Sequence, residues 1–200
     1  IGYNTRLVPR AEAPKLYADL LDPKWKGKIC ANDPKGSAVG AAIWKTIEKQ
    51  YGEDFMRRLA AQNITFSSAT GTLLPKLVAG EFLIYLNTLI STFESSKLGG
   101  DPVDWVRQSD NITFTQLGGV FGISANAPHS NTAKLWLDIV LSKEGQQIFA
   151  DRGSIPNMGG VRISNPDLTI AGKKVIQLET VSDAERTAFL AALDAKYHFG

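Results

Sequence analysis

Two short turns of small polar residues carry the chemistry that this sequence encodes most clearly. Each lies between a strand-like and a helix-like segment, one at 35–38 (Lys-Gly-Ser-Ala) and one at 68–72 (Ser-Ala-Thr-Gly-Thr). Backbone N–H groups in the first turn of a helix lack intrahelical partners and lie at the positive end of the helix dipole. Because small side chains let an oxygen atom approach this backbone, and hydroxyl groups add donors, the turns predict an oxyanion site. The alternative is that the Ser and Thr side chains only cap helices.

The two turns can form one site only if they meet at the same edge of a sheet. Ligands of open α/β sheets bind at the carboxyl ends of the strands, where both turns are expected. The candidate ligand-binding residues in the turns are Lys35, Gly36, Ser37, Ala38, Ser68 and Thr70. The sequence Gly36-x-x-x-Gly40 lacks the Lys-Ser or Lys-Thr that would complete a P-loop.

The sequence contains no other recognisable reactive arrangement. Its only histidines, His129 and His198, belong to no metal-ligand spacing, and no Gly-x-Ser-x-Gly elbow or Cys/His pairing suggests a nucleophile. We therefore expect no metal site, no cofactor and no catalytic residue. Paired carboxylates for acid–base catalysis need no proximity in sequence, so that class of enzyme stays open.

The composition is that of an ordinary globular protein. Of its 200 residues, 44% are hydrophobic and 21% charged, and 22 Lys and Arg against 20 Asp and Glu argue against nucleic-acid binding. No apolar stretch is long enough for a membrane helix. The single cysteine, Cys30, excludes an internal disulfide and is expected to be a buried, inert thiol. The four tryptophans are expected in the core: Trp25, Trp44, Trp105 and Trp136.

Strand-like and helix-like segments alternate, which predicts an α/β fold with a mostly parallel sheet flanked by helices. Apolar residues recur at helical spacing after the first turn, and Gly52 is expected to end that helix before a second one over 53–60. A capping box at 182–185 starts the last helix. The predicted strands are 28–31, 64–66, 82–86, 103–106 and 120–123.

Eight motifs stand in an order and spacing that match one protein family. They are Tyr3-Asn4-Thr5, YADLLDPKWKGK at 17–28, Asn32-Asp33-Pro34, LVAGE at 77–81, GDPVDWV at 100–106, ISANAP at 123–128, AKLWLD at 133–138 and LSKEGQQ at 141–147. Through them the chain resembles the extracellular solute-binding proteins of ABC importers. The resemblance is strongest to the ferric-iron-binding branch, which has the type 2 periplasmic-binding fold.

The resemblance implies two lobes that close on a ligand. Residues 1–112 and 161–200 would form the C-terminal lobe, and 113–160 the remainder of an N-terminal lobe whose first hundred or so residues are absent from this chain. Residues 113–160 would then expose an apolar face, so we expect self-association with another copy or a longer parent protein. The implied protein is a periplasmic or extracellular non-enzyme that works with ABC permease subunits; its signal peptide is not in this chain.

The chain departs from the iron-binding pattern at the metal ligands. Iron-binding members place adjacent tyrosines where this sequence has Thr88 and Leu89, after Asn87. A threonine hydroxyl stays protonated and leucine has no donor atom, so the usual ferric site is not encoded. The resemblance implies that the anion-binding part of the family's site is retained. The residues Lys35-Gly36-Ser37-Ala38, Ser68 and Asn87 match positions that contact an anion in that family.

We therefore expect capture of a small anionic or anion-bearing solute, with Asn87 and Thr88 added to the residues of the two turns. Two other functions stay open at this point. One is a ligand-sensing domain of a transcription regulator, which shares the fold; the other is an enzyme that acts on phosphate esters.

Overall fold

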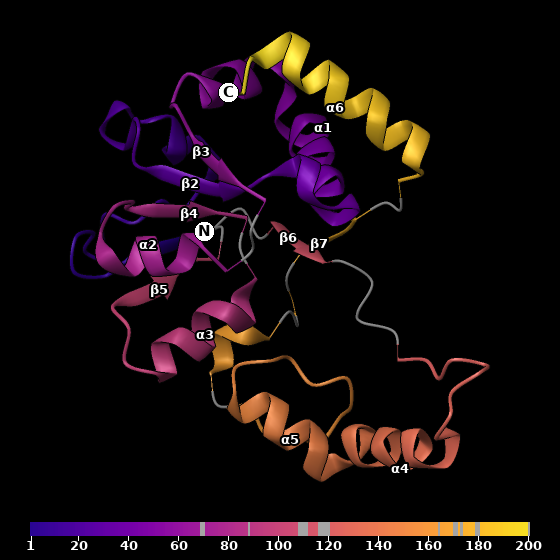
Figure 1. Ribbon diagram of the computed structural model, residues 1–200. Coiled ribbons are helices and arrows are strands. Elements are labelled where there is room, and N and C mark those ends of the chain that lie inside the picture. Colours follow the sequence, from indigo (N-terminus) through magenta and orange to yellow (C-terminus); the bar gives the residue numbers. More distant parts are fainter. Residues whose placement is uncertain are drawn as a thin grey trace.

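The computed structural model describes residues 1–68, 71–87, 89–107, 112–115, 121–163, 165–169, 172, 174–178 and 181–199. A five-stranded mixed sheet lies at its centre (Figure 1). Its strands are β1 (Gly2–Asn4), β2 (Ile29–Asn32), β3 (Thr65–Ser67), β4 (Ile84–Leu86) and β5 (Val103–Trp105). Across the sheet they lie side by side in the order β3-β2-β4-β1-β5. β2 is parallel to β3 and β4, whereas β1 is antiparallel to β4 and β5. Every strand except β1 thus runs in one direction, and the predicted α/β class is confirmed.

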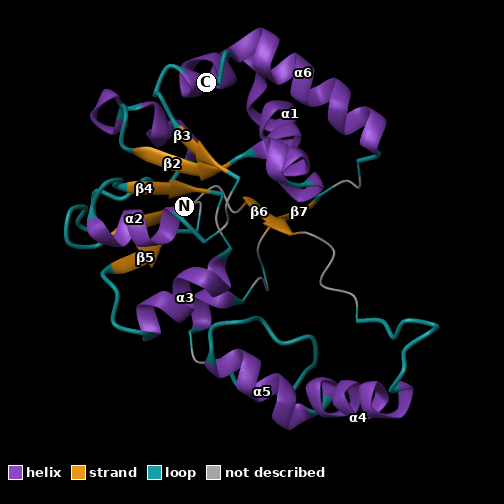
Figure 2. Ribbon diagram, viewed as in Figure 1, coloured by secondary structure: helices purple, strands orange, loops and turns teal. Residues whose placement is uncertain are grey.

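Helices cover both faces of this sheet (Figure 2). On one face, α1 (Ala38–Ala60) and α6 (Asp183–Tyr197) pack on a core that includes Ala31 and Leu86. On the other, α2 (Leu73–Ala79) and α3 (Ile90–Leu98) pack on a core that includes Cys30 and Tyr85. Successive residues of β2 and β4 thus alternate between the two cores, as strand geometry requires. Four single-turn helices complete this part: η1 (Tyr17–Leu21), η2 (Pro23–Trp25), η3 (Pro34–Gly36) and η4 (Pro166–Leu168).

The helix α1 consists of two segments that meet at Gly52. The backbone φ of Gly52 is 81°, a left-handed value that side-chain-bearing residues rarely adopt, so the helical path breaks there. The predicted boundary between two helices at Gly52 is confirmed. The capping box predicted at the start of α6 is also present, with Ser182 and Glu185 as its partners.

A separate pair of parallel strands, β6 (Ile112–Thr115) and β7 (Lys174–Gln177), joins segments about sixty residues apart. The sequence pattern did not predict either strand. The strand predicted at 120–123 is wrong, because residues 121–123 are irregular and residue 120 lies outside the described part. An apolar run without a hydrogen-bonding neighbour does not form a strand.

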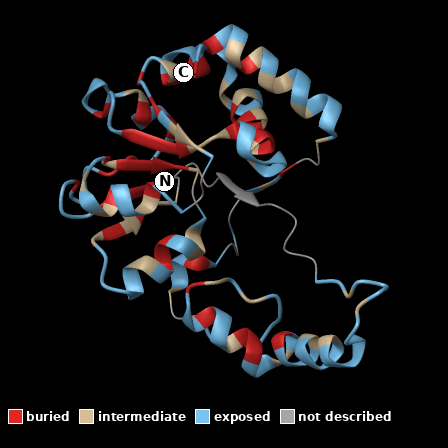
Figure 3. Ribbon diagram, viewed as in Figure 1, coloured by how far each residue is buried: buried red, intermediate tan, exposed pale blue. Residues whose placement is uncertain are grey.

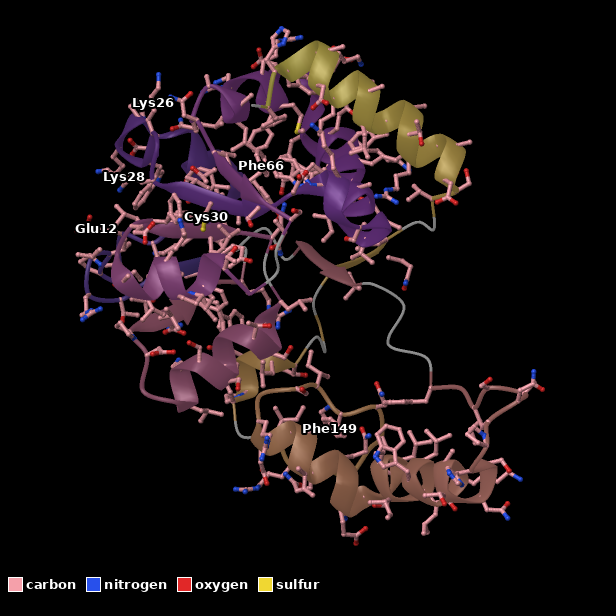
Figure 4. All side chains as sticks on the ribbon, viewed as in Figure 1. Glu12, Lys26, Lys28, Cys30, Phe66 and Phe149 are labelled. Carbon is pink, nitrogen blue, oxygen red and sulfur yellow. The ribbon has the colours of Figure 1, made fainter. Side chains whose placement is uncertain are left out.

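The helices α4 (Ser130–Leu141) and α5 (Lys143–Asp151) pack on each other, apart from the sheet (Figures 1 and 3). Their large apolar side chains are exposed, including Leu135, Ile139, Ile148 and Phe149 (Figure 4). Trp136 is 53% exposed, so its predicted place in the core is wrong, whereas the other three tryptophans are buried. The apolar spacing of α4 forms one face of a helix, on which Val140 is buried and Trp136 contacts the ring of Phe121, whereas Leu141 stays exposed. Among the described helices, none has both the length and the apolar character to cross a bilayer.

The buried side chain of Glu94 in α3 connects α5 and the following loop to the sheet. Its carboxylate accepts hydrogen bonds from Trp105 Nε1 and, at 3.0 Å, from Asn165 Nδ2. Gly153, just after α5, approaches so closely that a Cβ atom would lie 2.3 Å from Glu94 Cβ. Its φ of 86° also favours glycine. The close approach of the chain after α5 to α3 therefore requires glycine at this position.

The thiol of Cys30 should be unreactive in the folded protein. Cys30 lies in the middle of β2 with no exposed surface, and burial raises its pKa to about 12 (Figure 4). Because the thiolate is the nucleophile, we expect a disulfide reagent at pH 8 to label it about a thousandfold more slowly in buffer than in denaturant. Equal labelling rates in the two conditions would contradict this burial.

Candidate functional site

A cavity of about 220 Å³ lies where β2, β3 and β4 end and α1 begins. Its lining residues are Asn32, Asp33, Gly36, Ser37, Val39, Gly40, Ile43, Trp44, Ser67, Ser68, Asn87 and Leu89. A larger hollow of about 680 Å³ is lined by residues between Ala11 and Trp25 together with Arg58. That hollow lies at the amino end of β2, whereas ligands of open α/β sheets bind at the carboxyl ends. The smaller cavity is therefore the candidate site.

Three polar side chains form a row along the floor of the cavity. Asn32 at the end of β2 is in register with Ser67 at the end of β3, and Ala31 is in register with Leu86 of β4. Asn87, the next residue after β4, therefore occupies the position beside Asn32. Neighbouring strands are about 4.8 Å apart, so the row brings an amide, a hydroxyl and a second amide within reach of one small ligand.

The two turns predicted from the sequence meet at this row. A Cβ atom built on Gly36 would lie 3.6 Å from both Cα and Cβ of Ser68. The N–H of Asp33 donates to the carbonyl of Ser67 at 3.0 Å, which fixes the chain after β2 against the end of β3. Gly36, Ser37, Ser68 and Asn87 thus line one cavity.

Ser37 is the N-cap of α1. Its Oγ accepts a hydrogen bond from Gly40 N–H at 2.9 Å, and its own hydroxyl proton remains as a donor. The N–H groups of Ala38 and Val39 belong to the first turn, where no helical carbonyl is available to them. The capping role and the ligand-binding role of Ser37 are therefore compatible, since they use different atoms.

Lys35, a candidate ligand-binding residue in the sequence, does not line the cavity. Its Nζ pairs with Asp194 of α6 at 2.9 Å, and this partner raises the pKa of Lys35. Its carbonyl accepts a hydrogen bond from Arg186 Nη2 at 2.7 Å. A long lysine side chain can reach a nearby carboxylate, and here that carboxylate lies on α6. Lys35 therefore connects the turn to α6 on the outer surface, away from the cavity.

The remaining predicted residues divide into two groups. Ala38 is the first residue of α1 and does not line the cavity. Thr70 and Thr88 lie outside the described residues.

Leu89, where iron-binding proteins have a tyrosine, borders the cavity and is 63% exposed. Within the described ranges, no group of three His, Cys, Asp or Glu side chains could hold a metal ion.

Sequence reasoning missed two features of the cavity. Asn32 and Asp33 line it, although the sequence gave them only as part of a family motif; their position at the end of a strand was the available signal. Val39, Ile43 and Leu89 give the cavity an apolar wall; the first two belong to the apolar stripe of the predicted helix, and Leu89 stands at a position where the resemblance expects a tyrosine. The cavity therefore combines a polar floor with an apolar wall.

The described lining of the cavity contains one charged side chain, Asp33. Its Oδ1 accepts a hydrogen bond from Lys35 N–H at 2.8 Å. An oxyanion at the floor would thus be held by neutral N–H and O–H donors. One such donor, Asn87 Nδ2, is buried with no hydrogen-bond partner in the part of the chain that the structure describes, a state that costs about 1–3 kcal/mol. An incoming oxygen atom would remove that cost.

Comparison with known proteins gives one family and several more distant structural relatives. Residues 1–105 match the family model of the bacterial extracellular solute-binding proteins. A periplasmic protein of Salmonella typhimurium, proposed to bind 2-aminoethylphosphonate, is 26% identical over 151 residues, which are 72% of this chain and 44% of that protein. An Fe(3+)-binding periplasmic protein of Serratia marcescens is 24% identical over 202 residues, 89% of this chain and 59% of that protein.

The fold is shared with a solved structure as well. The substrate-binding protein of an ABC transporter from Agrobacterium tumefaciens superimposes with a TM-score of 0.74 at 18% identity, covering 98% of this chain and 64% of that one. The chain spans about half the length of the curated relatives it matches. The similarity in structure establishes the fold.

The N-cap at Ser37 gives a test of the geometry that needs no ligand. Ser37→Ala removes the acceptor for Gly40 N–H and should lower the free energy of unfolding by about 1 kcal/mol. Ser37→Asp keeps an acceptor and should stay close to the original stability. Urea unfolding followed by tryptophan fluorescence measures both values. A fully stable Ser37→Ala variant would show that this hydroxyl does not cap α1.

Proposed function

Because this chain belongs to the bacterial extracellular solute-binding proteins, we propose that it captures a small organic oxyanion and delivers it to an ABC permease. The observation that carries the proposal is the convergence of Gly36 and Ser68 on the row formed by Ser67, Asn32 and Asn87. Small residues and donors meet there beside the N-terminus of α1. Such an arrangement stabilises negative charge without a metal or a basic side chain.

The described site favours an oxyanion over ferric iron. A threonine–leucine pair occupies the positions of the usual tyrosines, and phenolate oxygen is the hard anionic donor that ferric iron prefers. One curated relative has 2-aminoethylphosphonate in its name and another has iron. The phosphonate group suits the donors at the floor, the carbon chain suits Val39 and Leu89, and the ammonium group suits the carboxylate of Asp33. We therefore take 2-aminoethylphosphonate as the first probe.

The proposed mechanism is the closure of two lobes over the solute. Residues 1–112 and 161–200 would form one lobe, and residues 113–160 would belong to the other. The exposed apolar faces of α4 and α5 support this division, since a lobe that lacks part of its core leaves such faces uncovered. The family to which the chain belongs, and the periplasmic relatives, support a location of the whole protein in the periplasm or outside the cell.

The first test measures binding to the full two-lobed protein by titration calorimetry. 2-Aminoethylphosphonate should bind, and Ser37→Asp should weaken it at least tenfold (about 1.4 kcal/mol), because a carboxylate would face the oxyanion. Ser37→Asn is the matched control, since it caps the helix equally well and carries no charge. Unchanged affinity in Ser37→Asp would rule out this turn as the binding site. Enzymatic turnover of a phosphate ester would rule out the transport role.

The second test concerns the division into lobes. We expect the 200-residue chain alone to self-associate in sedimentation experiments, because Trp136 and Ile139 expose apolar surface. Replacing both with Ser should shift the chain toward monomer without lowering the unfolding midpoint, since neither is buried. A chain that stays monomeric at high concentration would argue against an uncovered lobe.

A further inference from the structure

Two asparagines at the floor of the cavity are each held by a tyrosine hydroxyl. Tyr17 donates from its hydroxyl to Asn87 Oδ1 at 2.8 Å, and Tyr85 donates to Asn32 Oδ1 at 2.8 Å. Asn32 ends β2 and Asn87 follows β4, so the two amides stand side by side at the edge of the sheet. The two tyrosines do not line the cavity.

The tyrosines come from opposite faces of the sheet. Tyr17 is 1% exposed and packs against Tyr51 and Phe55 in the core under α1, with ring centroids 5.0 and 6.3 Å away. Tyr85 is 2% exposed and packs against Phe93 in the core under α3, at 5.8 Å. Both hydroxyls are therefore held in place by buried aromatic packing, and each core presents one hydroxyl to the edge of the sheet.

In the structure each tyrosine hydroxyl donates to the amide oxygen of its asparagine, which corresponds to one of the two orientations of the amide. An asparagine side chain can present either its oxygen or its NH₂ group to a ligand, and rotation by half a turn exchanges them. With the oxygen bound to a tyrosine, the NH₂ group is left for the other side. Asn87 Nδ2 accordingly is buried with no partner among the described residues, and its backbone φ of 59° lies in the left-handed region, which asparagine tolerates.

We propose that Tyr17 and Tyr85 are positioning residues, which fix Asn87 and Asn32 so that both amides act as donors to the oxyanion. This inference rests on the proposed function, because it assigns a role in the same cavity. Neither tyrosine touches the solute. Each acts through its asparagine, and without the hydroxyl the amide turns freely and presents its oxygen to the oxyanion for part of the time.

The experiment is a double-mutant cycle on the full protein with 2-aminoethylphosphonate and inorganic phosphate as probes. Tyr17→Phe and Tyr85→Phe keep the aromatic rings and should each weaken binding about three- to tenfold. Asn87→Ala should weaken it about tenfold or more, and Asn87→Asp further still, because its second oxygen repels the oxyanion. In the Asn87→Ala background, Tyr17→Phe should have no additional effect on affinity.

The cycle separates positioning from general stabilisation. If Tyr17 serves only the core, its effect on affinity persists in the Asn87→Ala background, and the inference is overturned. Full affinity in both Phe variants also overturns it. If the unmutated protein binds neither probe, the proposed function itself is wrong. That outcome is distinguishable from one in which the protein binds a probe but the two Phe variants bind it equally well. Unfolding midpoints of all variants, measured without ligand, report the structural effect separately.

Discussion

The hydrogen bond from Asp33 N–H to the carbonyl of Ser67 holds the candidate site together. It extends the pairing of β2 and β3 by one residue beyond the strands, so the chain leaves β2 against the end of its neighbour. Gly36 then reaches Ser68, and α1 starts over the cavity. The outer contacts of Lys35 with α6 also anchor the turn, but they are solvent-exposed and weak.

The site depends on the sheet as much as on the turn. Parallel strands that end in register place Ser67, Asn32 and Asn87 side by side, and the alternation of side chains sends the preceding residues into two separate cores. Packing in each core therefore acts on the floor of the cavity through one tyrosine. Apolar packing on both faces of the sheet therefore keeps its polar edge rigid.

Local signals in the sequence predicted most of the elements and the two turns, because capping, glycine breaks and apolar spacing act over a few residues. They failed where the outcome depends on distant partners. Lys35 finds Asp194, far along the chain, and β6 pairs with β7 about sixty residues later. Trp136 has the spacing of a core residue, but it stays 53% exposed beside Phe121. Asn32 stood in the sequence only as part of a family motif, and its place in the cavity depends on its register with Ser67.

The charge of the described lining has a consequence for how a solute reaches the cavity. Asp33 is the one ionised side chain there, and the donors around it are neutral dipoles whose fields decay within a few ångströms. The described lining therefore adds no attractive charge for an anion, and the carboxylate of Asp33 opposes its approach. Selectivity between solutes then depends on short-range interactions inside the cavity. Shape, desolvation and the number of donors that find an acceptor determine which solute stays bound.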